Sequence, residues 1–363
     1  MKKNKNYVDL KDQPVPEGQH LLEVDDLKMY FHTEDGVVRA VDGVSYTLDR
    51  GETLGVVGES GSGKSVTAMT IMGLISMPPG KIEGGDVRYR GRSILEMTEE
   101  EMQHIRGNDI AMIFQDPMTS LNPVYKIGKQ VGEGLRLHRG YSKQEALKRA
   151  TELLDLVGIP EPEKRVNEYP HQFSGGMRQR VMIAMALACD PDILIADEPT
   201  TALDVTIQAQ IIELMQEMQE KNGNAIIMIT HDLGVVADMA DKIMVMYAGR
   251  PVEFGTAEEI FYESRHPYTW GLIRSIPEQA IDEKKPLTPI HGNPPSLMNL
   301  PEGCVFSPRC PYATDKCRKQ RPERVVTESG HYSACHYSGD REFLKNAPET
   351  SRTRKDSKKG GEA

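Results

Sequence analysis

Residues 58–65 read Gly58-Glu59-Ser60-Gly61-Ser62-Gly63-Lys64-Ser65 and fit the pattern G-x-x-x-x-G-K-[S/T] in full. The apolar residues 53–57 before this octet predict a buried strand, and residues 66–72 after it predict a helix. Glycines let backbone N–H groups approach a phosphate because they carry no Cβ, and the helix start adds the positive end of its dipole. In this setting we expect Lys64 to contact the outer phosphates and the Ser65 hydroxyl to hold Mg²⁺. The octet therefore predicts a phosphate-binding loop.

The composition is that of an ordinary globular protein, with 38% hydrophobic and 27% charged residues in a chain of 363. The net charge of −10 argues against nucleic acid as the main ligand, because no basic excess is present to neutralise a phosphate backbone. Residues 1–18 carry no apolar signal-peptide core, and no apolar run approaches the roughly 18 residues of a membrane span. We therefore expect a cytosolic protein that acts at a membrane only through partners.

Apolar patterning predicts an α/β protein. Residues 21–31 and 37–48 alternate between apolar and polar, which predicts an antiparallel pair. Four later apolar runs are continuous and predict strands covered on both faces; they are residues 110–114, 193–196, 225–229 and 243–246. Helical patterns at residues 143–157 and 208–221 alternate with these runs, as in a mostly parallel sheet.

Composition and patterning divide the chain into four parts. Residues 1–18 read as a flexible leader, and residues 19–265 as a nucleotide-binding domain with a helical insert at about residues 117–182. Residues 266–340 are rich in proline and predict a loop-rich extension. Residues 341–363 are charged and rich in small residues, so we expect disorder there.

Two further motifs carry groups that a nucleotide site needs. Asp197 and Glu198 follow an apolar run, and the carboxyl end of a parallel strand lies beside the phosphate loop in this topology. Asp197 can hold Mg²⁺, and Glu198 can polarise an attacking water. Ser174 and the two glycines after it precede a strongly helical segment and predict a second anion-binding helix start. One nucleotide does not need two such helix starts, which indicates two facing subunits, each of which offers this loop to the nucleotide of the other.

Taken together and in this order, the motifs resemble those of the ATP-binding subunit of an ABC transporter, over roughly residues 20–265. The resemblance implies a P-loop NTPase cassette with a mixed sheet, an antiparallel β subdomain and a helical insert. It also implies ATP and Mg²⁺ as ligands and ATP hydrolysis as the reaction. The positions that match the family's ATP contacts are Phe31, Gly58, Ser60, Gly61, Ser62, Gly63, Lys64, Ser65 and Val66. From the sequence, Phe31 is equally well read as an ordinary core residue.

The resemblance also implies catalytic roles. Glu198, His231 and Gln115 match the catalytic glutamate, the switch histidine and the Q-loop glutamine. Ser65, Gln115 and Asp197 match the contacts to Mg²⁺.

Contacts across a dimer are implied as well. Ser174, Gly175 and Gly176 match the signature that contacts the partner's ATP, and Asp204 matches the D-loop along the dimer seam. Met177 replaces the usual glutamine of the signature, while the serine and both glycines remain.

The type of transporter is indicated by segments outside the catalytic motifs. Residues 115–123, 265–269 and 292–295 resemble segments of oligopeptide/dipeptide permease ATPases, and residues 173–180 resemble the D-type member of a two-ATPase pair. This resemblance implies a peripheral subunit on the cytoplasmic face of the membrane. Its implied partners are a second, F-type ATPase, two transmembrane permease subunits and an extracytoplasmic peptide-binding protein. Two alternatives stay open: the same motor serving nickel or glutathione import, and a soluble ABC ATPase acting on nucleic acid or the ribosome.

Four of the five cysteines gather near the C-terminus, at Cys304, Cys310, Cys317 and Cys335. Cytosolic cysteines seldom form structural disulfides, so the group predicts a metal site. Four thiolates suit an iron–sulfur cluster or Zn²⁺, and some peptide-permease ATPases resemble this chain in carrying a [4Fe–4S] cluster. His331 and His336 could replace a cysteine in a zinc site, and free thiols remain a third possibility.

Overall fold

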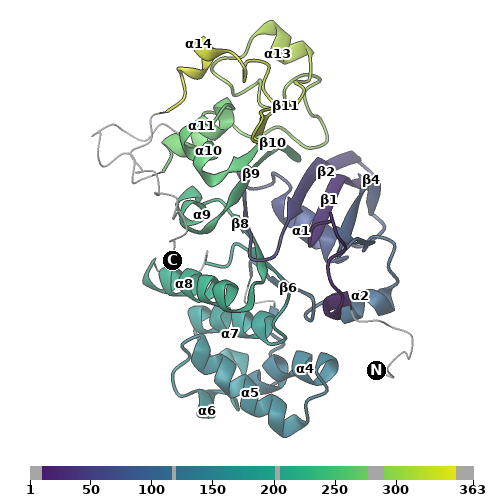
Figure 1. Cartoon of the computed structure of the whole chain (residues 1–363), viewed down its shortest axis with the longest axis vertical. Coiled ribbons are helices and arrows are strands. Elements are labelled where there is room, and N and C mark those ends of the chain that lie inside the picture. Colours follow the sequence, from purple (N-terminus) through teal and green to yellow (C-terminus); the bar gives the residue numbers. More distant parts are fainter. Residues whose placement is uncertain (1–9, 117–119, 201–204, 277–289, 349–363) are drawn as a thin grey trace.

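A computed structural model describes residues 10–116, 120–200, 205–276 and 290–348 (Figure 1). Two β-sheets lie at its centre, with helices around them and a C-terminal extension at one end. Helices α4 to α6 lie at the opposite end of the molecule from this extension (Figure 1).

The smaller sheet is antiparallel, with the strand order β2-β1-β4-β5. Its strands are β1 (Leu22–Thr33), β2 (Gly36–Leu48), β4 (Gly80–Tyr89) and β5 (Arg92–Ser93), and a short 3₁₀ helix, η1 (Leu10–Asp12), precedes them. Strands β1 and β2 pair as their alternating pattern predicted. The sequence pattern did not reveal β4, which contains three glycines and keeps only two fully buried apolar side chains, Val87 and Tyr89.

The larger sheet has eight strands in the order β11-β12-β10-β9-β3-β8-β7-β6. Five of them pair in parallel: β3 (Thr53–Val57), β6 (Ile110–Ile113), β7 (Ile193–Asp197), β8 (Ala225–Thr230) and β9 (Lys242–Tyr247). Strand β10 (Arg250–Thr256) pairs antiparallel with β9. The expected mostly parallel sheet is therefore confirmed.

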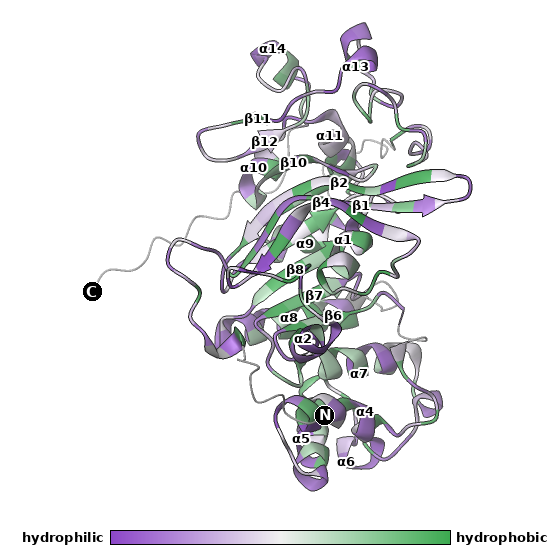
Figure 2. Cartoon of the chain, turned by 90° about the vertical axis from the view of Figure 1, so that its right-hand side faces the viewer, coloured by the Kyte–Doolittle hydropathy of each residue, from purple (hydrophilic) through white to green (hydrophobic). Residues whose placement is uncertain are grey.

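The continuous apolar runs are explained by burial of both sheet faces. Along β8, Ile227 and Ile229 point to a core shared with the antiparallel sheet, whereas Ile226 and Met228 point to a core shared with the helices. Figure 2 shows these central strands as a hydrophobic layer inside more hydrophilic surroundings. Because these central strands contribute to both cores, apolar side chains dominate both of their faces.

Helices cover the sheet and form the insert. The helices of the cassette are α1 (Lys64–Ile71), α2 (Glu99–Ile105), α4 (Ile127–His138), α5 (Lys143–Leu156), α6 (Pro162–Arg165), η2 (Pro170–Gln172), α7 (Gly175–Leu187), α8 (Val205–Asn222) and α9 (Leu233–Met239). Helix α5 begins with a capping box, in which Ser142 and Glu145 each accept a hydrogen bond from the other's backbone N–H. Among the described residues, no helix is long and apolar enough to cross a membrane.

The C-terminal extension is attached to the larger sheet. Helix α10 (Ala257–Tyr262) precedes it, and the described elements from residue 266 onward are α11 (Pro267–Arg274), α13 (Asp315–Lys319), β11 (Val325–Val326), β12 (Tyr332–Ser333) and α14 (Arg341–Leu344). Strand β12 pairs with β10, so the extension adds two strands to the sheet edge. The expectation of disorder from residue 341 does not hold for residues 341–348, because Phe343 packs against the rings of Trp270, Tyr312 and Tyr337.

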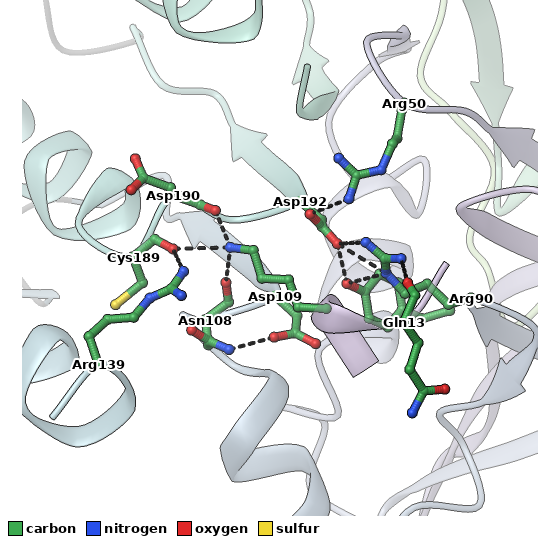
Figure 3. A network of polar contacts seen from close by, with 11 residues as sticks. Gln13, Arg50, Arg90, Asn108, Asp109, Arg139, Cys189, Asp190 and Asp192 are labelled. Carbon is green, nitrogen blue, oxygen red and sulfur yellow. Dashed lines mark hydrogen bonds and ion pairs between the residues drawn. The ribbon is translucent and has the colours of Figure 1, made fainter. Parts of the chain in front are cut away.

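A buried polar network joins the two sheets at the start of β7 (Figure 3). Asp192, which is 4% exposed, accepts hydrogen bonds from Arg90 Nη2 at 2.5 Å, Tyr89 Oη at 2.6 Å and Arg50 Nη2 at 2.8 Å. The Arg90 side chain is also buried. Because Arg90 follows β4 directly, this carboxylate fixes the antiparallel sheet against the parallel one.

We expect Asp192→Ala to destabilise the chain strongly, because it leaves the buried Arg90 guanidinium without its counter-charge. Removing one partner of a buried pair costs about 3–5 kcal/mol. Urea unfolding monitored by circular dichroism measures the change. Asp315→Ala is the control, because Asp315 pairs with Arg318 on the surface and its loss should leave the midpoint unchanged. Equal midpoints for both variants would contradict this role of Asp192.

Candidate functional site

The predicted phosphate loop connects β3 to α1, as its sequence required. Two of its glycines are forced by close packing. A Cβ on Gly58 would lie 2.2 Å from the carbonyl oxygen of Met246, and one on Gly63 would lie 2.2 Å from that of Ala40. Both glycines also have positive φ angles, 153° and 99°, which side chains disfavour. The loop can therefore sit against these backbones only with glycine at both positions.

Lys64 begins α1 and is 6% exposed. Its Nζ donates hydrogen bonds to the carbonyl oxygens of Gly58, at 2.8 Å, and Glu59, at 3.1 Å. Burial lowers the pKa of Lys64, and the carboxylates of Glu198, Asp197 and Glu59 act in the opposite direction. The lysine is thus held inside the curve of the loop, where a bound anion would favour its charged form.

Ser65 and Asp197 meet beside the loop. The Ser65 hydroxyl donates to Asp197 Oδ1 at 3.0 Å, although 132 residues separate the two. Burial raises the pKa of Asp197, repulsion from Glu198 adds to this, and Ser65 and Lys64 oppose it. A hydroxyl and a carboxylate are the oxygen ligands that Mg²⁺ takes in phosphate-transfer sites. A divalent cation here would also favour ionised Asp197.

Three predicted catalytic residues gather at the ends of neighbouring strands. Gln115 follows β6, Glu198 follows β7 and His231 follows β8. Gln115 Nε2 donates to Glu198 Oε2 at 2.9 Å, and His231 Nδ1 lies 3.4 Å from Glu198 Oε1. The Glu198 backbone has φ of 47° and donates its N–H to Ile229 on β8. This left-handed turn directs the chain away from β7 and leaves the carboxylate between Gln115 and His231.

The N-terminus of α7, which Ser174 caps, lies at the surface. Ser174 caps α7 by accepting a hydrogen bond from Met177 N, and it is exposed. A Cβ on Gly175 would meet nothing within 4 Å, and Gly176 is half-buried. The described contacts of Ser174 belong to its own helix. The structure therefore leaves this end of α7 open to another molecule.

Other predicted positions surround these groups. Ser60 and Gly61 are exposed on the loop, and Val66 packs partly against the core under the antiparallel sheet. The Ser62 hydroxyl is buried and has no hydrogen-bond partner among the described residues. Phe31 is half-buried and packs against the same core, so its stacking role stays a prediction. Asp204 lies outside the described residues.

The four C-terminal cysteines line one pocket, with His336 among the other lining residues. Burial raises the pKa of Cys304, that of Cys310 to about 11 and that of Cys335 to about 12. Within the described ranges, however, no three His, Cys, Asp or Glu side chains are placed so that they could hold a metal ion together. His331 is held by Glu253, 3.0 Å from its Nε2. The expected metal site is therefore not supported by this arrangement.

Sequence reasoning missed three residues at the site. Glu59 of the loop is contacted by Tyr268 and Arg309, both from the extension. A carboxylate inside a phosphate-binding loop was a signal for a neighbouring cation, since it would otherwise repel the ligand. Which cation serves could not be read from a separation of 250 residues.

Comparison with known proteins agrees with this geometry. Residues 41–201 match the family described as ABC transporter, and residues 252–317 match the oligopeptide/dipeptide transporter, C-terminal region. The oligopeptide transport ATP-binding protein OppD of Bacillus subtilis (strain 168) is 58% identical over 86% of this chain and 87% of that protein. The chain belongs to the ABC transporter ATP-binding proteins of the oligopeptide/dipeptide type. Its expected activity as an ATPase is thereby confirmed.

Further relatives support the assignment. The dipeptide transport ATP-binding protein DppD of Escherichia coli (strain K12) is 52% identical over 88% of this ABC ATPase and 97% of its own length. Among solved structures, the ATP-binding cassette MJ0796, described as a dimer in a post-hydrolysis state bound to ADP and Pi, is 29% identical with a TM-score of 0.60. That match covers 65% of this chain and 98% of that chain, and the expected ABC cassette fold is confirmed.

The residues present fit a magnesium nucleotide. The buried Lys64 offers a cation, the Ser62 hydroxyl has an unused hydrogen-bonding group, and Ser65 with Asp197 offers oxygen ligands. These are the groups that a phosphate-binding loop requires.

We expect Gly58→Ala to weaken nucleotide binding, because the new Cβ would lie 2.2 Å from the Met246 carbonyl oxygen and force the loop out of place. Isothermal titration with MgATP should show an increase in Kd of more than about tenfold, which corresponds to about 1.4 kcal/mol. Gly339→Ala is the matched control, since a Cβ there meets nothing within 4 Å. Unchanged affinity in a folded Gly58→Ala chain would refute the steric argument.

Proposed function

We propose that this ABC ATPase is the subunit that powers import of oligopeptides or dipeptides, through ATP-driven closure of two ATPase subunits. ATP hydrolysis is supported by the contacts of Gln115 and His231 with Glu198, near the Ser65–Asp197 pair. The cargo is supported by relatives named for oligopeptide and dipeptide transport and by the C-terminal region that they share with this chain.

Each group at the site has a distinct task in this proposal. Lys64 and the loop N–H groups bind the phosphates, and Ser65 and Asp197 hold Mg²⁺, which neutralises phosphate charge. Glu198 polarises the attacking water. Gln115, which donates to one oxygen of Glu198, fixes the direction of that carboxylate. His231 Nδ1 lies 3.4 Å from the other carboxylate oxygen of Glu198, and in this proposal the imidazole contacts the γ-phosphate.

A second subunit completes the site. The exposed cap of α7 offers Ser174 and open backbone N–H groups to a phosphate held by the neighbour. Two subunits therefore close head to tail around two ATP molecules, and hydrolysis reopens them. The dimeric ATP-binding cassettes among the structural relatives support such an arrangement. Asp204 would lie along the seam between the subunits.

The remaining partners follow from the family. We place the chain at the cytoplasmic face of the membrane, bound to two transmembrane permease subunits that receive substrate from an extracytoplasmic peptide-binding protein. The second ATPase in this proposal is a different, F-type subunit. ATP binding drives closure of the two ATPase subunits, a conformational change that uses binding energy. The region of Gln115 and the helical insert transmits this motion to the permease subunits.

We expect Glu198→Gln to bind MgATP with an affinity close to that of the unchanged chain and to lose turnover by about 10²–10⁴-fold, the usual contribution of a general base. With ATP present, the variant should accumulate as a closed dimer on size-exclusion chromatography. In cells it should fail to restore uptake of labelled peptides to a deletion strain.

Glu220→Gln serves as the control, because Glu220 is an exposed acid on α8. Normal turnover by Glu198→Gln would refute the role of Glu198. Restored uptake of nickel or glutathione, without peptides, by the unchanged chain would refute the cargo while leaving the ATPase intact.

We also propose that the four cysteines of the extension take up a metal centre, a [4Fe–4S] cluster or Zn²⁺. The proposal is supported by their shared pocket and by the preference of thiolate sets for these centres. Because the side chains as placed do not form a ligand group, binding requires them to turn toward a common point.

We expect chain purified without oxygen to carry either broad visible absorbance with bound iron, or stoichiometric zinc without colour. Visible spectroscopy and elemental analysis distinguish the two. Cys310→Ser should lower the metal content, whereas Cys189→Ser, a buried position in the core of the cassette, should not. A colourless, metal-free chain after anaerobic purification would leave four free thiols and end this proposal.

A further inference from the structure

Glu59, the second residue of the phosphate loop, is held by two residues of the C-terminal extension. Its backbone N–H donates to Tyr268 Oη at 2.9 Å. Its carboxylate forms a two-bond ion pair with Arg309, in which Nη1 donates to Oε2 at 2.5 Å and Nη2 to Oε1 at 2.9 Å. Paired bonds of this kind fix both the position and the orientation of a carboxylate. The extension therefore contacts the loop itself.

The Arg309 guanidinium is fixed before it reaches Glu59. The side chain is 5% exposed. Its Nε donates to the His291 carbonyl at 2.9 Å, Nη2 also donates to the Ile290 carbonyl at 3.2 Å, and Nη1 lies 3.3 Å from Tyr247 Oη. A planar guanidinium held on several edges loses little freedom when it binds a carboxylate. Arg309 is thus a preset partner for Glu59.

The backbone that carries Arg309 rests on an aromatic cluster. Phe306 packs against the rings of Tyr247 and Tyr268, with centroids 5.2 and 5.3 Å apart. The Arg309 N–H donates to the Phe306 carbonyl oxygen at 3.0 Å. Tyr247 ends β9, and Tyr268 lies on α11. One rigid cluster therefore carries both groups that contact Glu59.

Glu59 in turn shapes the part of the loop that holds Lys64. Its carbonyl oxygen accepts hydrogen bonds from Lys64 Nζ, at 3.1 Å, and from Ser62 N, at 3.2 Å. Its carboxylate is close enough to Lys64 to influence that group's pKa. An unpaired negative charge at this place would repel a triphosphate. The ion pair with Arg309 neutralises that charge and holds this part of the loop in place.

We propose that Arg309 is a positioning residue for nucleotide binding, which clamps and neutralises Glu59 so that the C-terminal extension sets the affinity of the phosphate loop for ATP. The inference rests on the proposed ATPase function but is independent of the cargo. It gives the extension a task at the nucleotide site in addition to any metal that its cysteines bind.

The charge argument predicts a specific pattern among variants. Arg309→Gln leaves an unpaired carboxylate in the loop and should raise the Kd for the magnesium complex of adenylyl imidodiphosphate by at least about tenfold. Glu59→Gln removes the repulsion at its source. The double variant should therefore recover affinity to within about threefold of the unchanged chain. Arg309→Lys, which keeps the charge without the paired geometry, should fall between Arg309→Gln and the unchanged chain.

The test uses the full chain, with isothermal titration for the Kd and steady-state hydrolysis for KM and kcat. Arg309 contacts none of Gln115, Glu198 and His231 in the described structure, so KM should rise while kcat changes by less than about twofold. Arg318→Gln is the control, because it removes the same charge from the exposed side of the extension. Thermal unfolding without nucleotide verifies that each variant folds.

Equal affinities for Arg309→Gln and Arg318→Gln, or the same loss for Arg309→Gln with and without Glu59→Gln, would overturn the clamp. If Arg309→Gln does not fold, Arg309→Lys and the double variant still test the clamp. The clamp predicts that the double variant binds nucleotide at least as tightly as Arg309→Lys, and weaker binding by the double variant would overturn it. Failure of the unchanged chain to bind nucleotide would instead overturn the proposed function.

Discussion

The close contact between the phosphate loop and the backbone around it is the constraint on which the nucleotide site depends. Gly58 and Gly63 each lie against a carbonyl that leaves no room for a Cβ, one at the end of β9 and one on β2. The loop is also tied by a hydrogen bond from Gly249 N to the Ser62 carbonyl, and Gly249 in turn accepts one from Asp42 N. Both sheets therefore hold the loop. Its shape depends on their relative position, which the Asp192–Arg90 pair helps to fix.

The parallel strands and the carboxyl-end cluster were predictable because they follow from local patterns. Continuous apolar runs indicated strands buried on both faces, and the residues after them had to meet at one sheet edge. Gln115, Glu198 and His231 are brought together for that reason. Strand β4 was missed because its glycines and charged residues hide the alternation. The order at residues 341–348 was missed because one aromatic side chain, Phe343, outweighs a charged composition.

The contacts that join the extension to the loop could not be predicted, because no local pattern records them. Arg309 looks like any arginine in a proline-rich segment, and Tyr268 like any residue of a short helix. They meet at Glu59 although 209 and 250 residues separate them from it in the sequence. Phe306, whose carbonyl oxygen accepts a hydrogen bond from Arg309 N, packs against both Tyr247 and Tyr268. These contacts depend on long-range packing, whereas the acid within the loop is visible in the sequence.

The extension is tied to the sheet and to the phosphate loop through one buried carboxylate, Glu253. A buried pair, Glu253 with His331, ties β10 to the residue before β12, and Glu253 also accepts hydrogen bonds from the backbone N–H groups of Arg265 and His266. Those two residues lead into α11, which carries Tyr268 to the loop. One fully buried carboxylate thus connects the sheet edge, the extension and the helix that contacts Glu59. Cys310 directly follows Arg309, and the backbone N–H groups of both residues donate to the Phe306 carbonyl oxygen, so the cysteine pocket and the contact to Glu59 share one short stretch of backbone.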